Sequence, residues 1–102
     1  MKTVIINKNK FDEMSKNKKP LLLDFYANWC GPCKILSPII DEIAEERDDI
    51  VVGKVNVDAE PELAEQFNVF SIPTLVIMKD GEIIHQSSGA RPKAQILNLL
   101  ND

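Results

Sequence analysis

The segment Leu23-Asp24-Phe25-Tyr26-Ala27-Asn28-Trp29-Cys30-Gly31-Pro32-Cys33-Lys34 leads from an apolar run into a closely spaced pair of cysteines. Residues 21–27 are nearly all apolar, which is typical of a strand covered on both faces, and only Asp24 interrupts them. From Gly31 or Pro32 onward the spacing of apolar residues becomes helical, at Leu36, Ile40, Ile43 and Ala44. The segment therefore predicts a central strand, a tight loop holding Cys30, and a helix with Cys33 in its first turn.

The rest of the chain alternates between strand and helix patterns. Its 102 residues are the usual size of one domain, so we expect residues 1–102 to form a single domain. Further strands are expected over residues 3–6, 50–57, 74–78 and 82–86, and helices around Phe11 and Met14, over 60–67 and over 92–100. Asp80-Gly81 indicates a hairpin, so the last two strands should be antiparallel. This order predicts an α/β fold, with a mixed central five-stranded sheet flanked by four helices.

The charge and the apolar runs of the chain restrict its partners and its location. A formal net charge of −4 gives no attraction to nucleic-acid phosphates or anionic membranes, so neither is expected as a partner. No stretch approaches the roughly 20 apolar residues of a membrane span. Residues 1–7 lack the apolar run of a signal peptide, so we expect a cytoplasmic protein.

Two cysteines in a reducing compartment indicate redox chemistry or metal binding rather than a structural staple. A helix N-terminus favours a thiolate at Cys30, which makes Cys30 the expected nucleophile and Cys33 the resolving thiol. The alternatives are a structural pair of buried thiols or half of a zinc site. A structural pair does not account for the position at a helix start. Zinc would need further ligands, and the chain offers no third cysteine and only His85, so no metal is expected; we interpret His85 as a strand residue without a catalytic role.

Asp24 is the second candidate for chemistry. Because it interrupts an apolar strand six positions before Cys30, it should lie buried beneath the active site with a raised pKa. Such a carboxylate can accept the proton of Cys33, directly or through a water. The alternative is a structural carboxylate paired with a neighbour, and Lys54 in the next buried strand is the candidate neighbour that would modulate Asp24. Lys54 as a solvated lysine at an edge is the other interpretation.

Together these motifs resemble the thioredoxin family over essentially the whole chain. The resemblance rests on the quoted segment and on Pro38, Lys54-Val55-Asn56-Val57-Asp58, Ser71-Ile72-Pro73-Thr74 and Ser88-Gly89-Ala90. The chain departs from the family pattern at Tyr26, where tryptophan is frequent, at Asn28, where an acidic residue is common, and at the variable position Ser71. These departures concern the choice of partners rather than the chemistry.

The resemblance implies the thioredoxin fold and a general protein-disulfide reductase that carries electrons and maintains the cell's redox balance. Its redox group would be the Cys30–Cys33 disulfide, with no bound cofactor. A thioredoxin reductase would recharge it, so that NADPH is used only indirectly, and the chain itself has no dinucleotide fingerprint. We accordingly expect two kinds of partner, the reductase and substrate proteins with disulfides, and a monomeric protein.

The resemblance also implies a substrate surface. In this family Pro73 follows a cis peptide bond and packs beside the cysteines, which exposes the backbone of Ile72 to an extended substrate. From the residues alone, Pro73 would be trans and would merely begin a strand. The other residues expected to line this surface are Trp29, Gly31, Pro32, Gly89 and Ala90. For Trp29, ordinary core packing is the alternative.

The sequence is also compatible with two other functions. The same fold can serve as a disulfide-forming oxidant or isomerase, because the direction of exchange depends on the reduction potential. Gly31-Pro32 and the missing signal peptide favour the reductase. A folded domain that acts only as a binding subunit of a larger assembly is the non-enzymatic alternative, and its activity would survive the loss of both thiols.

Overall fold

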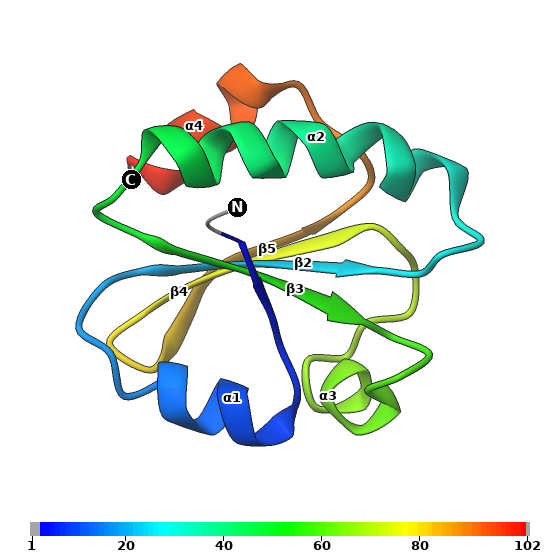
Figure 1. Ribbon diagram of the computed structural model, residues 1–102, viewed down its shortest axis with the longest axis horizontal. Helices are drawn as coiled ribbons and strands as arrows, with labels where there is room; N and C mark the ends of the chain where they lie inside the picture. Colours follow the sequence, from blue (N-terminus) through cyan, green and yellow to red (C-terminus); the bar gives the residue numbers. More distant parts are fainter. Residues whose placement is uncertain (1–2, 102) are drawn as a thin grey trace.

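The computed structural model describes residues 3–101 and contains a five-stranded sheet between two layers of helices (Figure 1). In chain order the elements are β1 (Val4–Ile5), α1 (Lys8–Met14), β2 (Leu21–Tyr26), α2 (Gly31–Glu46), β3 (Val51–Asn56), α3 (Pro61–Gln66), β4 (Thr74–Lys79), β5 (Glu82–Ser88) and α4 (Lys93–Leu100). The α/β architecture, with a mixed sheet and four helices, is confirmed. Residues 1, 2 and 102, which the predicted domain includes, lie outside the described residues.

The strands follow the order β1-β3-β2-β4-β5, which places β2 in the middle of the sheet. β2 pairs in parallel with β3 and antiparallel with β4, so the sheet is mixed as predicted. β4 and β5 form the predicted antiparallel hairpin. Asp80 and Gly81 at its turn have φ angles of 53° and 81°, the positive values that tight hairpin turns require.

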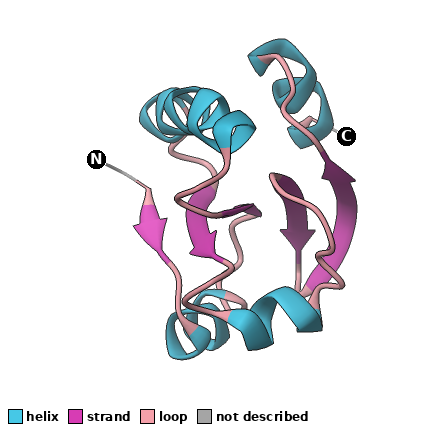
Figure 2. Ribbon diagram, turned by 90° about the vertical axis from the view of Figure 1, so that its right-hand side faces the viewer, coloured by secondary structure: helices cyan, strands magenta, loops and turns pink. Residues whose placement is uncertain are grey.

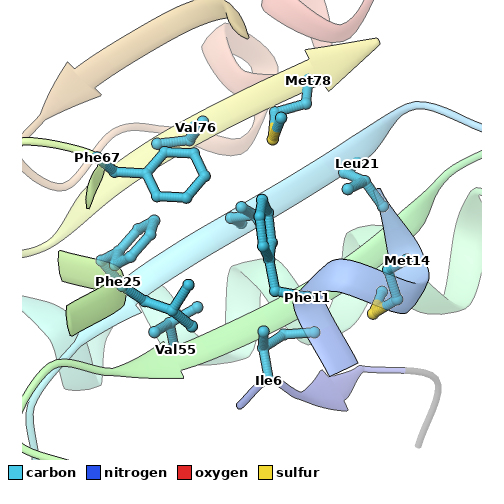
Figure 3. Close-up of a cluster of buried hydrophobic side chains, with 11 residues drawn as sticks. Ile6, Phe11, Met14, Leu21, Phe25, Val55, Phe67, Val76 and Met78 are labelled. Carbon is cyan, nitrogen blue, oxygen red and sulfur yellow. The ribbon is translucent and has the colours of Figure 1, made fainter. Parts of the chain in front are cut away.

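Alternation along β2 sorts its side chains between the two faces of the sheet. Leu21, Leu23 and Phe25 join the cluster on the side of α1 and α3, part of which Figure 3 shows. Leu22 joins the opposite cluster, beneath α2 and α4. Figure 2 shows the helices of the two layers on either side of the strands. Asp24 has the same parity as Leu22 and therefore faces α2.

Helix α2 begins where the chain leaves the central strand. Cys30 is its N-cap, with Pro32 in the first turn, a position where proline is tolerated because the amide has no partner within the helix. The predicted apolar stripe of the helix is buried, at Leu36, Ile40, Ile43 and Ala44. Among residues 3–101, no helix is long and apolar enough to cross a membrane.

Gly53 lets the side chain of Ile6 lie close to the backbone of β3, a contact that the sequence pattern does not reveal. A Cβ atom at this position of β3 would lie 2.6 Å from Cγ1 and 2.8 Å from Cδ1 of Ile6. Ile6 follows β1 and is only 2% exposed, so it has little room to move. The missing side chain therefore lets the N-terminal segment pack against the sheet.

Replacing Gly53 with alanine is expected to lower the free energy of unfolding by about 2 kcal/mol, since overpacking a filled core forces side chains out of their rotamers. Urea titration at neutral pH measures this loss. In an Ile6→Ala background, which removes both clashing atoms, the same substitution should cost much less. An equal cost in the two backgrounds would contradict the steric explanation.

Candidate active site

Cys30 and Cys33 form a disulfide at the N-terminus of α2, with their Cα atoms 5.3 Å apart. The chain passes from the carboxyl end of the central strand β2 through a short loop into α2 (Figure 1). The Cys33 amide donates a hydrogen bond to Cys30 Sγ over 3.2 Å. In the reduced protein this amide and the helix dipole favour a thiolate at Cys30.

A second segment approaches the disulfide from the start of β4. The Ile72–Pro73 peptide bond is cis, as the family resemblance implies. The carbonyl oxygen of Ile72 lies 3.9 Å from Cys30 Sγ. Gly89 has a φ of 97°, and its amide donates to the Pro73 carbonyl over 2.8 Å. The structure thus gathers the expected segments around Cys30 and Pro73.

Trp29 lies on the surface, so the core-packing alternative is wrong. Its side chain is 70% exposed, and its Nε1 donates to Asp58 Oδ2 over 2.8 Å. This bond fixes an apolar ring beside the disulfide. Asp58 belongs to the segment that carried the resemblance, but nothing in the local pattern linked it to Trp29. Of the other residues expected at the substrate surface, Gly31, Pro32 and Ala90 are exposed, Ile72 and Gly89 are half-buried, and Pro73 is buried.

Asp24 is buried, as its position in an apolar strand predicts. It is 1% exposed, and its Oδ1 has no hydrogen-bond partner among the described residues. Burial raises the pKa of Asp24 to about 6, the ammonium of Lys54 acts against this rise, and the carboxylate of Asp41 adds to it. An Asp with this pKa changes protonation state just below neutral pH.

This buried carboxylate makes the stability of the oxidised protein depend on pH. The pKa rises from 3.8 to about 6 on folding, so the folded state holds its proton more tightly and loses stability as pH increases through this interval. Relative to wild type, the Asp24→Asn variant should gain about 3 kcal/mol in free energy of unfolding between pH 3.5 and pH 7. Urea titrations of both proteins at the two pH values measure this change. A difference between the proteins that is independent of pH would contradict it.

Lys54 lies next to Asp24 but does not form an ion pair with it. The two residues are Cα partners in the parallel pairing of β2 and β3. Lys54 Nζ instead lies 2.8 Å from Asp41 Oδ1 and donates to Ser37 Oγ over 2.6 Å. Its side chain is only 12% exposed, so it is not a solvated edge lysine. The pairing of Asp24 with Lys54 that the sequence suggested as an alternative is therefore absent.

A cavity of about 370 Å³ connects these groups. Its walls include Asp24, Cys33 and Lys54, while Asn28 and Lys34 on its lining are exposed. The cavity lies beside the second cysteine rather than the first, since Cys30 does not line it. Water entering from the surface can reach both the Cys33 sulfur and the Asp24 carboxylate.

The two sulfurs thus have different surroundings. Cys30 lies beside the backbone of Ile72, whereas Cys33 borders a cavity with a titratable carboxyl group. A pair that closes within one helical turn, with one sulfur near a backbone carbonyl and the other on a cavity shared with a carboxyl group, is suited to thiol–disulfide exchange. The chain is a dithiol–disulfide oxidoreductase.

The comparisons with known proteins agree with this class and make it specific. The family model described as Thioredoxin matches residues 2–102, and the chain belongs to the thioredoxin family. It is 50% identical over 92 residues to a thioredoxin of Mycobacterium tuberculosis, covering 89% of this chain and 78% of that protein. A thioredoxin of Alicyclobacillus acidocaldarius is 41% identical over 101 residues, covering 98% and 96% of the two chains.

A longer relative and a solved structure add to this result. A protein of Mycobacterium leprae named bifunctional thioredoxin reductase/thioredoxin is 43% identical over 93 residues, which cover 90% of this chain and 20% of that protein. A mutant thioredoxin from Halobacterium salinarum NRC-1 superposes with a TM-score of 0.92 at 32% identity, covering 98% of this chain and 88% of that chain. The protein is a disulfide reductase with the thioredoxin fold, and the Cys30–Cys33 disulfide is its redox group.

Proposed function

We propose that the protein reduces disulfides of other proteins in two exchange steps. The Cys30 thiolate attacks one sulfur of the substrate disulfide; the substrate S–S bond breaks, a Cys30–substrate bond forms, and the other substrate sulfur leaves as a thiolate. Cys33 then loses its proton and attacks Cys30 Sγ. The Cys30–Cys33 bond forms, the bond between Cys30 and the substrate breaks, and the substrate sulfur that Cys30 had held leaves as a thiolate. Two electrons have then passed to the substrate.

The observation that supports this division of roles is the different setting of the two sulfurs. Cys30 Sγ accepts the amide hydrogen bond at the start of α2, which stabilises the thiolate that must attack first. It also lies beside the Ile72 carbonyl, where an extended substrate would align its backbone. Trp29, Gly31, Pro32, Pro73, Gly89 and Ala90 complete the proposed substrate surface.

Asp24 is the proposed proton acceptor for Cys33, because the two residues line the same cavity. With its pKa raised to about 6, Asp24 is ionised at pH 7 and yet close enough to neutrality to take up a proton. In this scheme Lys54 modulates Asp24 through its positive charge without contacting it.

The partners of the cycle follow from the direction of electron flow. The oxidised disulfide must be reduced again, and we propose a separate thioredoxin reductase, with NADPH as the electron source. The Mycobacterium leprae protein, named as both reductase and thioredoxin, supports this pairing. We further propose a single domain over residues 1–102 that acts as a monomer on substrate proteins, without nucleic acid or membrane partners. Its location would be the cytoplasm, where thiols are kept reduced.

A coupled assay tests the proposal. With thioredoxin reductase, NADPH and insulin, catalytic amounts of the protein should drive continuous NADPH oxidation and precipitation of the insulin B chain. The Cys30→Ser/Cys33→Ser double variant is the matched control and should give only the background rate. Full activity of the double variant, or a strongly oxidising potential of the Cys30–Cys33 pair, would contradict a reductase.

A further inference from the structure

We propose that Asp41 and Ser37 are positioning residues that hold the ammonium group of Lys54 away from Asp24, leaving the Asp24 carboxylate unpaired and able to accept the Cys33 proton. The proposal rests on the proposed role of Asp24 as proton acceptor. Neither Asp41 nor Ser37 touches a reacting sulfur through any described contact, so both act through Lys54.

The contacts of Lys54 support this inference. Its Nζ donates to Ser37 Oγ over 2.6 Å and lies 2.8 Å from Asp41 Oδ1. Ser37 and Asp41 lie one turn apart on α2 and therefore present their side chains on the same side of the helix. Two groups of one rigid helix thus bind a single ammonium. Of these two contacts, the one with Ser37 is a hydrogen bond, and the one with Asp41 Oδ1 is an ion pair without hydrogen-bond geometry. Asp24 Oδ1 also has no hydrogen-bond partner among the described residues, and no ion pair joins Asp24 to Lys54.

Asp24 and Asp41 compete for the same cation. Asp24 and Lys54 are Cα partners on adjacent strands, and such partners lie about 5 Å apart. The four-carbon side chain of Lys54 is long enough to turn toward either carboxylate. An ammonium paired with Asp24 would stabilise its anion and make it a poor base. The choice of partner by Lys54 therefore sets the basicity of Asp24.

Among the groups around Asp24, the competition for Lys54 is the main influence on the pKa of Asp24 that a substitution can change. Lys54 on β3 and Asp41 on α2 are the charged groups whose interactions act on its pKa. Cys33 and Lys34 of α2 and Tyr26 of β2 are the other titratable groups on the shared cavity. From β4, the strand on the other side, the residue opposite Asp24 is the apolar Leu75.

The Asp41→Asn variant tests the proposal directly in the oxidised protein, where no thiol titrates. The titration of the Asp24 carboxyl carbon, followed by NMR, should move to lower pH by about one unit, because Lys54 is released to pair with Asp24. Ser37→Ala, which changes no charge, should move it in the same direction by a smaller amount. The matched control is Glu45→Gln, an exposed carboxylate on the same helix, and it should leave the titration in place.

A double-variant cycle separates positioning through Lys54 from the direct repulsion between the two carboxylates. In a Lys54→Met background, the shift caused by Asp41→Asn should fall to less than half of its wild-type size. An undiminished shift, or a wild-type titration in both Asp41→Asn and Ser37→Ala, would overturn the proposal.

The rate of the resolving step distinguishes this inference from the proposed function. In Asp41→Asn its pH profile should move by the same amount as the Asp24 titration. If the titration moves and the rate profile does not, Asp24 is not the proton acceptor, and the proposed step fails although Lys54 is positioned as inferred.

Discussion

Replacing Cys33 with serine is expected to prolong the mixed disulfide between Cys30 and a substrate protein by at least about 10³-fold. In the wild-type protein the resolving thiol is one helical turn away and attacks intramolecularly, at an effective concentration far above that of any free thiol. In the variant, only dissolved thiols can release the substrate. Rapid acid quenching followed by mass spectrometry of the adduct measures its lifetime.

Cys30→Ser is the matched control for this experiment. It removes the sulfur at the N-cap of α2, where the Cys33 amide donates its hydrogen bond, so no adduct should accumulate. The assignment of the two cysteines would be reversed if Cys30→Ser trapped substrates and Cys33→Ser did not.

The second large effect is expected from Asp24→Asn, which should slow the resolving step by about 10²-fold near pH 7, the scale of losing a general base. The slowing should depend on pH. Below the Asp24 pKa of about 6, the wild-type carboxyl is itself protonated and the two proteins converge. At alkaline pH, hydroxide can take the Cys33 proton without help from Asp24, so the difference narrows again.

Stopped-flow decay of a preformed mixed disulfide, recorded from pH 5 to pH 9, measures this profile. Asp12→Asn is a suitable control, since it removes an exposed carboxylate on α1, across the sheet from α2. Equal resolving rates for Asp24→Asn and wild type at pH 7 would exclude proton transfer to Asp24.

The fold was predictable from sequence because its signals are local. The apolar run of β2, the helical spacing after Cys30 and the Asp80-Gly81 turn each depend on neighbouring residues. The same holds for the burial of Asp24, since a single carboxylate within an otherwise apolar strand is carried into the interior with its neighbours. The cis bond before Pro73 was predicted only from the family resemblance, because the residues alone favoured a trans bond.

Contacts between distant segments were not predictable in this way. The partners of Lys54 depend on which helix covers β3, and no local pattern connects it to Ser37 or Asp41. The packing of Ile6 against Gly53 depends on strand order. The hydrogen bond of the Trp29 side chain is to Asp58, which lies 29 positions away. Each of these features appears only when the sheet has been assembled.

The central place of β2 has a further consequence for the lifetime of the site. β2 is hydrogen-bonded on both sides, by β3 and β4, whereas β1 has only two residues and β5 forms the other edge. Amide hydrogen exchange should therefore be fastest at the edges and slowest in β2, whose opening requires global unfolding. The loop that carries Cys30 directly follows β2, which is expected to open last. The redox pair should therefore stay assembled while the edge strands of the sheet fray.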